Sequence, residues 1–364
     1  MQLQSLQALR AVAAMMVLAS HLAQSEIRFV DDAISPVWLV AGVSGVDLFF
    51  VISGVVMVYV TRATPAADAG AVGAFLYARV TRIYPVYWVF TAAMLAAYAL
   101  VPGPSRSGAD FDLVSTLFLL PSDQAPVLVV AWTLVHEMYF YLAFALLLIA
   151  PARWLPALLL GWMAGVGAAQ ISGVSEINAW TRIAFHPLTA EFVMGAFIGL
   201  LVASGRRRFS TAAVGLGVAW WVTASVLLAP YQAFDDVPMG WDRVLAWGVP
   251  AALIVYGVIG LELDHKLRTP GALVRIGDWS YALYLCHLPI VAMISRLWAS
   301  RAPDLGVWDN MMLLILGAAV SLAVAAAAFH LFERPALGAT RALGRQLFKD
   351  DRSAGARAPA DRIW

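Results

Sequence analysis

Residues 6–22 read LQALRAVAAMMVLASHL, an apolar run of membrane-spanning length that contains Arg10 and His21. Eleven residues separate these two side chains, so both project from one face of a helix, roughly 16 Å apart along its axis. Ionisable residues inside a membrane-spanning helix are energetically expensive, and by default they face a protein-lined cavity and have a function there. This stretch therefore predicts a membrane helix with two functional side chains.

The composition of the whole chain indicates a membrane protein. Of its 364 residues, 62% are hydrophobic and 13% are charged, and the mean hydropathy of +0.77 is higher than in soluble domains of this size. Apolar stretches long enough to cross a bilayer recur along nearly the whole chain. We predict an all-α, polytopic membrane protein with ten transmembrane helices, at 6–24, 43–60, 83–101, 132–150, 155–173, 187–204, 211–229, 244–262, 278–298 and 309–332.

The basic residues predict the orientation of this bundle. Most arginines and lysines fall in alternate segments between the spans, whereas the other segments are acidic, for example at Asp31, Asp110 and Asp235. The positive-inside rule then places both termini in the cytoplasm. Residues 1–335 form one membrane domain, and 336–364 are expected to be a polar, basic, loosely ordered cytoplasmic tail near anionic lipid. No metal site is expected, since the single cysteine lies in no cysteine–histidine cluster. No nucleic-acid partner is expected either, and the net charge of +1 gives no information on one.

Three polar residues are expected at similar depth near the outer face. His21 ends the first span, Asp47 opens the second, and Glu137 lies near the start of the fourth. Thr133, Glu137 and Tyr141 follow an i, i+4, i+8 spacing, which gives one polar stripe in the outer half of that helix. If the three helices converge, His21 gains carboxylate partners that fix its tautomer and raise its basicity.

Basic residues are expected at the cytoplasmic end. Arg79 and Arg82, at i, i+3, approach the third span, and Pro85 is well suited to open that helix. Paired guanidinium groups match phosphate oxygens, and Arg10 adds a third cation in the inner half. One end therefore suits an anion and the other suits proton transfer, which fits a long, phosphate-headed donor that enters from the cytoplasm.

Six motifs follow one another along the chain. They are Arg10-x10-His21, Gly45-Val46-Asp47-Leu48-Phe49-Phe50-Val51-Ile52-Ser53-Gly54, Arg79-x-x-Arg82-Ile83-x-Pro85, Trp132-Thr133-Leu134-x-x-Glu137-x-x-Phe140-Tyr141, Ser280-Tyr281-x-Leu283-Tyr284-Leu285-x-His287-x-Pro289 and Phe332-Glu333-x-Pro335. In this order they resemble the acyltransferase-3 family of integral membrane enzymes. The overall pattern is similar to the exopolysaccharide acetyltransferases of Gram-negative bacteria. The resemblance implies ten spans and transfer of an acyl group, usually acetyl, from cytoplasmic acyl-CoA to a sugar hydroxyl of a lipid-linked or exported glycan.

The resemblance also implies site residues. The family's functional arginine and histidine correspond to Arg10 and His21, its arginine pair to Arg79 and Arg82, and its membrane glutamate to Glu137. The chain departs from the family's usual Arg-Arg-x-x-Arg run, because a valine follows Arg79. The donor phosphates are therefore expected to have fewer contacts here, or to be contacted by other arginines. No bound cofactor is implied beyond the acyl-CoA substrate, and a bacterial inner membrane is the expected location.

In the expected mechanism, the donor's nucleotide end docks at Arg79 and Arg82 and its pantetheine arm passes Arg10. His21 then acts as general base on the acceptor hydroxyl, or as a transient acyl carrier, with Glu137 orienting it. Asp47 is a further catalytic candidate, and these remaining residues are candidates to line the cavity: Thr133, Tyr141, Tyr284 and His287.

Other interpretations stay open. The buried acids are also suited to holding helices together. Arg79 and Arg82 are also suited to anchoring the topology, and His287 is equally suited to a network around a proline kink. A transporter or flippase of lipid-linked sugars would also use a relay of Arg, His, Asp and Glu. Against transport, the two halves of the chain lack paired Gly/Pro-broken segments. Within the enzyme class, succinyl transfer is the nearest alternative to acetyl transfer.

Overall fold

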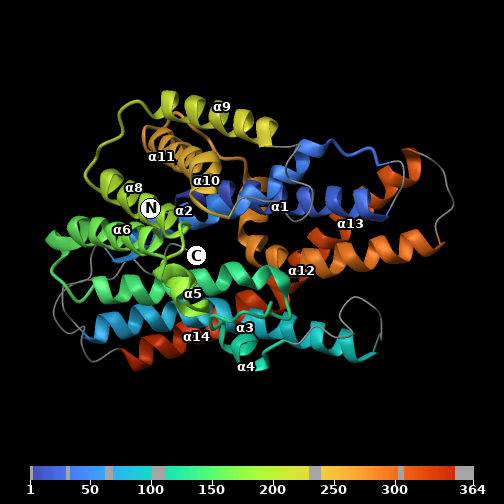
Figure 1. The fold of residues 1–364 in the computed structure, drawn as a ribbon, viewed down its shortest axis with the longest axis horizontal. Coiled ribbons are helices and arrows are strands. Elements are labelled where there is room, and N and C mark those ends of the chain that lie inside the picture. Colours follow the sequence, from blue (N-terminus) through green and yellow to red (C-terminus); the bar gives the residue numbers. More distant parts are fainter. Residues whose placement is uncertain are drawn as a thin grey trace. The chain divides into compact units, whose positions relative to one another are not determined.

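The computed structural model describes residues 3–29, 33–61, 69–100, 111–228, 239–301 and 307–348. Regular structure in these ranges is entirely helical (Figure 1). Ten helical segments are long and apolar enough to cross a membrane, and each overlaps one of the ten predicted spans. The prediction of an all-α polytopic fold is therefore confirmed, whereas the orientation of the termini stays a prediction.

The bounds of the elements follow, with η marking short 3₁₀ or π-helical segments. In chain order they are α1 (Gln4–Phe29), η1 (Val37–Ser44), α2 (Gly45–Thr61), α3 (Ala69–Leu100), α4 (Leu113–Phe118), η2 (Val129–Ala131), α5 (Trp132–Leu147), η3 (Ala152–Trp154), α6 (Leu155–Ser172), η4 (Val174–Glu176), α7 (Ala179–Ala184), α8 (Thr189–Ala203), α9 (Ser210–Leu228), α10 (Trp241–Arg243), η6 (Val244–Gly248), α11 (Val249–Leu263), α12 (Gly271–Arg301), α13 (Val307–Ala328), η7 (Phe329–Glu333) and α14 (Arg334–Leu347).

The structure corrects the predicted start of the third span. Pro85 lies inside α3 and does not open it, because the helix already begins at Ala69. A proline is tolerated inside a membrane helix when neighbouring groups satisfy the freed backbone carbonyl. As a result, Arg79 and Arg82 are inside α3 and not on its approach.

The predicted tail also needs a correction. Residues 334–347 form α14, an amphipathic helix, so the first part of the expected loosely ordered tail is helical. The proposed division at residue 335 into membrane domain and tail stays a prediction. Several residues of the sequence-based topology lie outside the described residues: Asp31, Asp32, Arg62, Arg106, Asp110, Asp235, Asp236 and the stretch 349–364.

The chain divides into two units. The first comprises Met1–Val56 and Ala190–Phe329, and the second comprises Met57–Thr189 and His330–Trp364. Each unit combines an early and a late part of the sequence, and each contains some of the predicted site residues. They are described separately below.

In the first unit, α1 packs along α12 and also contacts α13 (Figure 1). The helices approach very closely at Gly277 of α12, where an added Cβ would lie 2.0 Å from the backbone oxygen of Gln7. Small residues allow such backbone-to-backbone contact between membrane helices. This contact fixes α12 against the helix that carries Arg10 and His21.

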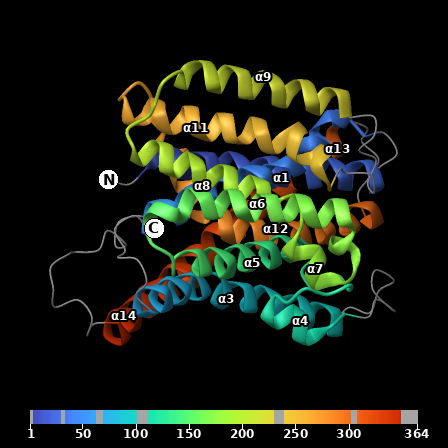
Figure 2. The same ribbon diagram turned by 60° about the vertical axis from the view of Figure 1, so that its left-hand side comes forward.

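Another part of the first unit pairs α9 with α11, which run side by side in Figure 2. The cytoplasm-predicted end of α11 also supports α1, because the carboxylate of Glu262 accepts hydrogen bonds from the backbone N–H groups of Gln4 and Ser5, at 2.8 and 3.1 Å. Amide groups in the first turn of a helix lack partners within the helix. Glu262 therefore caps the start of α1.

In the second unit, α3 contacts both α5 and α14 (Figure 2). The Tyr77 hydroxyl of α3 donates to the backbone oxygen of Thr340 at 2.9 Å, and the Tyr77 ring packs against Gly344. These contacts hold the C-terminal helix against the helix that carries Arg79 and Arg82.

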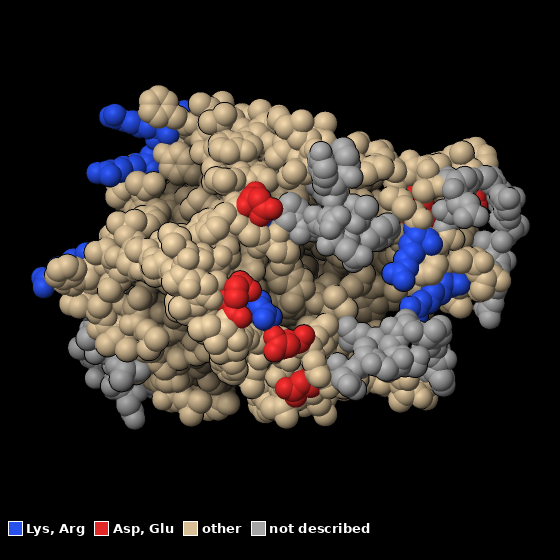
Figure 3. All heavy atoms as spheres, in the orientation of Figure 1, with Lys and Arg blue, Asp and Glu red and all other residues tan. Residues whose placement is uncertain are grey.

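The surface fits a membrane environment. The face drawn in Figure 3 has few charged side chains over most of its area. Large apolar side chains are exposed on several spans, such as Ile171 (91% exposed) and Leu146 (67%). Exposed apolar surface of this extent is normal where lipid is the solvent and abnormal in water. The chain is a multi-pass membrane protein.

Candidate active site

The first unit brings His21 of α1 against His287 of α12. Nδ1 of His21 lies 3.4 Å from Nε2 of His287, and the ring centroids are 5.0 Å apart. His287 is 1% exposed, and the His21 side chain is half-buried. His287 was predicted only as a cavity-lining candidate, so the structure gives it a more direct place beside His21.

Backbone carbonyls define the tautomers of this histidine pair. Nδ1 of His21 lies 2.9 Å from the oxygen of Val17, and Nδ1 of His287 lies 3.0 Å from the oxygen of Leu283. A carbonyl oxygen only accepts, so each Nδ1 carries the hydrogen of a neutral imidazole. Nε2 of His287 is then an acceptor for the Nδ1–H of His21. Nε2 of His21 keeps its lone pair for other chemistry.

An aromatic side chain completes this side of the pair. The ring of Tyr284 lies 5.8 Å from that of His287 and 5.9 Å from that of Phe49 on α2, measured between centroids. Tyr284 was the other cavity-lining candidate on α12, one turn before His287. The structure thus brings α1, α2 and α12 together around the histidine pair.

Asp47 is paired with Arg243, a residue that the sequence analysis did not select. Its two oxygens accept hydrogen bonds from Nε and Nη2 of Arg243, at 3.0 and 2.8 Å. Asp47 is 0% and Arg243 2% exposed. The expectation that Asp47 would be a partner for His21 is therefore not met: its carboxylate is occupied by an arginine in a bidentate pair, which offsets part of the cost of burial.

Arg243 ends α10 and is buried at the start of a span. Asp47 and Arg243 are 196 positions apart, and the residue pattern of one helix does not identify a partner on another helix. The sequence signal for such a partner was Asp47 itself, because a carboxylate inside the membrane requires a cation or a hydrogen-bond donor nearby.

Glu191 of α8 adds a second acid to this pair. It is 0% exposed, its nearest charged neighbours are Asp47 and Arg243, and none of the described donors satisfies either carboxyl oxygen. A Cβ on Gly248 would lie 2.7 Å from Glu191 Oε1, so that glycine makes room for the carboxyl group. We refer to Asp47, Glu191 and Arg243 as the acid–arginine cluster.

Arg10 lies on α1 three turns before His21, as predicted, and is half-buried. It belongs to the first unit together with the histidine pair. A role in donor binding stays a prediction for this residue.

The second unit brings Arg79, Tyr141 and Glu137 together. The guanidinium of Arg79 lies 5.9 Å from the ring centroids of both Tyr141 and Phe75, and the Tyr141 hydroxyl donates a hydrogen bond to Glu137. Arg79 is only 5% exposed. Because aromatic faces attract guanidinium groups, Arg79 is stabilised in this buried position.

This arrangement corrects the predicted separation of Arg79 and Glu137 to opposite sides of the membrane. The longer α3 moves Arg79 about ten residues into its helix, to the level of Tyr141. The predicted polar stripe on α5 is confirmed for Glu137 and Tyr141, which are four residues apart and joined by a hydrogen bond. The hydroxyl of Thr133 donates to the backbone oxygen of Val130 at 3.0 Å.

Arg82 forms a buried ion pair with Glu333, which is 0% exposed. Glu333 ends η7 and directly precedes α14, where Pro335 stands in the first turn. The sequence motif Phe332-Glu333-x-Pro335 contained this glutamate, but the motif did not indicate its partner. Binding of a donor phosphate by Arg82 stays a prediction, as does the expected approach of Glu137 to His21.

Comparison with known proteins assigns the chain to a family. A family model described as an acyltransferase domain matches residues 3–330. The exopolysaccharide production protein ExoZ of Rhizobium meliloti (strain 1021) is 30% identical over 311 residues, which cover 83% of this chain and 91% of that protein. The acyltransferase MdmB of Streptomyces mycarofaciens is 30% identical over 341 residues, which cover 85% of this chain and 84% of that protein. No solved structure matches significantly. The chain therefore belongs to the acyltransferase-3 family and is a multi-pass membrane acyltransferase.

Proposed function

We propose that this acyltransferase moves an acyl group, acetyl in the first instance, from cytoplasmic acyl-CoA to a sugar hydroxyl of an exported or lipid-linked glycan. Its location is the inner membrane of a bacterial cell, with both termini in the cytoplasm. The name of ExoZ supports an exopolysaccharide as the acceptor. The observation that carries the proposal is the histidine pair, in which the Nδ1–H of His21 is held by Val17 and His287 while Nε2 is left as a base.

The proposed step conserves atoms and protons. Nε2 of His21 takes the proton of the acceptor hydroxyl while the hydroxyl oxygen forms a bond to the thioester carbonyl carbon. The carbon–sulfur bond breaks, and the departing coenzyme A thiolate takes the proton from the imidazolium. The products are a sugar ester, a free thiol and the original neutral histidine. A positioned base of this kind contributes roughly 10²- to 10⁴-fold to rate.

The other predicted site residues have distinct roles in this proposal. Arg10, Arg79 and Arg82 contact the negatively charged donor, and the Tyr141–Glu137 hydrogen bond beside Arg79 orients that part of the site. Asp47 acts at a distance from the reacting atoms, because Arg243 occupies both of its oxygens, so we assign it the role of a positioning residue.

The test uses purified protein in lipid nanodiscs with [¹⁴C]acetyl-CoA and a glycan extract from bacterial membranes. We expect label to enter the glycan with the wild type and to fall by at least 10²-fold with His21→Ala, which should insert and fold normally. Label transfer that is retained in His21→Ala would remove the base role.

Two further arms separate the alternatives. Label that stays covalently on the protein when acceptor is left out, and that is lost in His21→Ala, would assign His21 as an acyl carrier. A parallel reaction with [¹⁴C]succinyl-CoA tests the acyl chain: faster transfer than from acetyl-CoA would overturn the acetyl assignment.

A further inference from the structure

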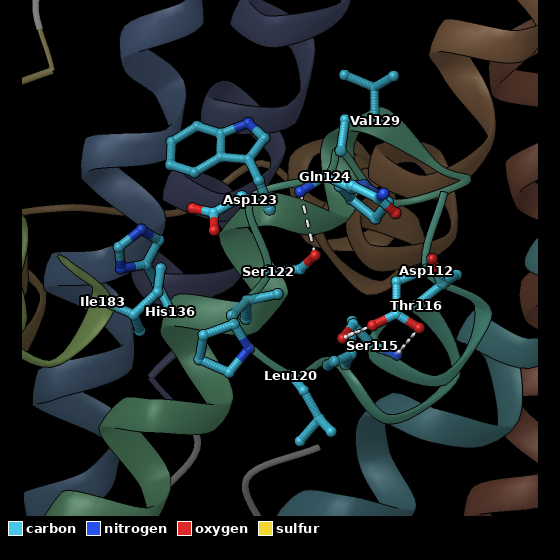
Figure 4. Close-up of a pocket in the computed structure, with 16 residues that line it drawn as sticks. Asp112, Ser115, Thr116, Leu120, Ser122, Asp123, Gln124, Val129, His136 and Ile183 are labelled. Carbon is cyan, nitrogen blue, oxygen red and sulfur yellow. Dashed lines mark hydrogen bonds between the residues drawn. The ribbon is translucent and has the colours of Figure 1, made fainter. Parts of the chain in front are cut away.

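A cavity of about 320 Å³ lies wholly within the second unit, and none of the residues assigned above lines it. Its wall is formed by the end of α4, the segment 119–129, the first turns of α5 and one residue of α7. Figure 4 shows Asp123 and Ser122 between His136 and Ile183 on one side and Asp112 and Thr116 on the other. The side chains that carry the argument are Asp112, Pro121, Ser122, Asp123, Gln124, Pro126 and Trp132.

The wall of the cavity is built by local hydrogen bonds. The Leu120 N–H donates to Ser115 O at 3.0 Å and the Val127 N–H to Thr116 Oγ1 at 3.4 Å, which closes the segment between them into a loop. Leu119 has φ 52°, a left-handed conformation that costs a residue with a side chain roughly 1–2 kcal/mol. Leu119 is the C-cap of α4, and its conformation ends that helix with hydrogen bonds back to Ser115 O and Thr116 O.

An ion pair joins this loop to the short helix beside it. Arg182 of α7 contacts Asp123 at 3.1 Å, and both side chains are well exposed. The pair leaves the Asp123 carboxylate exposed at the cavity. Because exposed ion pairs contribute little to stability, either partner can be replaced with little effect on the fold.

The charge of the lining disfavours the acyl-CoA phosphates as its ligand. The lining contains two carboxylates, Asp112 and Asp123, and neither arginine nor lysine. Hydrogen bonds from the Ser115 hydroxyl and from backbone amides hold the pKa of the Asp112 carboxyl below its usual range, so this group is ionised near neutral pH. An anionic ligand would be repelled here, whereas a neutral ligand rich in hydroxyl groups would find acceptors.

The remaining side chains suit a sugar ring. Trp132 and the rings of Pro121 and Pro126 supply flat apolar surface for the C–H face of a pyranose, and Gln124 and Ser122 supply donors and acceptors for its hydroxyls. A volume of about 320 Å³ is at the small end of small-molecule sites, about 300–1,000 Å³, and matches one or two sugar units.

We propose that this cavity is the subsite that holds a neutral sugar unit of the glycan acceptor. It precedes α5, the fourth span, whose start faces outward in the predicted topology, where an exported glycan is found. The assignment rests on the proposed function, since it names the part of the enzyme that selects the acceptor. Asp123 and Gln124 bind hydroxyl groups, and Trp132 stacks on the ring.

The test is saturation-transfer NMR on the full protein in nanodiscs, with the methyl glycosides of glucose, galactose and mannose as probes. At least one should show saturation of its ring protons, and methyl glucuronide, the glucose ring with a carboxylate, should show less than the glucoside. We expect Asp123→Ala and Gln124→Ala to weaken the signal at least fivefold. Arg182→Ala is the matched control, because it removes the same ion pair but keeps the carboxylate.

The outcomes separate the subsite from the chemistry. His21→Ala should bind the glycoside as the wild type does while transferring no label, so loss of transfer alone leaves the subsite standing. In the transfer assay, Asp123→Ala and Gln124→Ala should raise the acceptor KM at least fivefold without changing the KM for acetyl-CoA. An unchanged acceptor KM, absence of signal from all three neutral probes, or an equal loss in Arg182→Ala would each overturn the proposal.

Discussion

The histidine pair and the acid–arginine cluster lie in the same unit, yet they handle buried polarity in opposite ways. His21 and His287 are neutral, and their Nδ1 hydrogens are directed to backbone carbonyls, which leaves one lone pair of His21 for other chemistry. In the acid–arginine cluster, both oxygens of Asp47 are bound to Arg243. Proton transfer needs a group that is held but not used up by its partners, as His21 is in the histidine pair and Asp47 is not.

The difference between the two sites leads to a general expectation for their variants. Changes at the histidine pair should reduce catalysis more than stability, because a neutral group that loses a partner costs less than a buried charge that loses its counterion. Changes in the acid–arginine cluster should reduce stability first, because they leave a charge buried without its counterion. The predictions below test this contrast, from the largest expected effect to the smallest.

The largest effect is expected for Asp47→Ala. Removing one partner of a buried ion pair typically costs about 3–5 kcal/mol, because the other charge is left uncompensated. Arg243 is 2% exposed and cannot recover this loss from water. The thermal midpoint of the purified protein in detergent should fall strongly, as it should in Arg243→Ala.

The double variant Asp47→Leu/Arg243→Met is the control for this prediction. Replacing both charges with apolar groups of similar size is often neutral, so it should recover most of the lost stability. A double variant as unstable as Asp47→Ala would mean that the pair does more than neutralise charge. Full stability combined with loss of activity in Asp47→Asn would instead move Asp47 to the reacting atoms.

The next effect concerns the contact that sets α12 against α1. Gly277→Ala would place a Cβ 2.0 Å from the Gln7 oxygen, so the two helices must separate, at a typical cost of about 1–3 kcal/mol. Since His21 and His287 lie on these two helices, activity should fall together with the thermal midpoint. Gly161→Ala is the matched control, because nothing lies within 4 Å of that position. Equal behaviour of the two variants would contradict the close packing.

The ten spans could be predicted from the sequence because length and apolarity alone determine whether a helix can cross a bilayer. His21 could be selected as a candidate because an ionisable residue in a membrane-spanning helix differs from its apolar neighbours. The ends of the helices were harder to predict. Pro85 was expected to open the third span and Arg79 to precede it, yet both lie inside α3. In a bundle, aromatic rings and neighbouring helices stabilise residues that would end an isolated helix.

Partners were the least predictable part of the site. Periodicity tells which face of a helix a residue occupies but not which helix it meets, and Asp47–Arg243 and Arg82–Glu333 join positions 196 and 251 residues apart. The same reason explains why His287 was selected only as a lining residue. Its closeness to His21 depends on how α1 and α12 pack, which no single-helix pattern contains.

A smaller effect is expected for His287→Ala. It removes the acceptor for the Nδ1–H of His21 but leaves the Val17 carbonyl in place, so the loss is that of one ordinary hydrogen bond, about 0.5–1.5 kcal/mol. This corresponds to a roughly three- to tenfold lower kcat with the KM for acetyl-CoA unchanged. His287→Gln should restore part of the rate, because its amide oxygen can accept the same hydrogen bond. A change in KM without a change in kcat would assign His287 to binding and not to positioning.

The smallest effect is expected for Glu191→Gln, and its sign is opposite to that of Asp47→Ala. The Glu191 carboxyl has no described donor, while its neighbour Asp47 is an acceptor. A glutamine of the same shape supplies an N–H₂ group to that acceptor and removes the second acid beside a single guanidinium. The thermal midpoint should therefore rise slightly, by the equivalent of about 1 kcal/mol or less, with activity unchanged. If Glu191→Gln has wild-type stability but a large loss of acyl transfer, the acid–arginine cluster takes part in the chemistry. The histidine pair would then not be the only one of these two sites with a catalytic role.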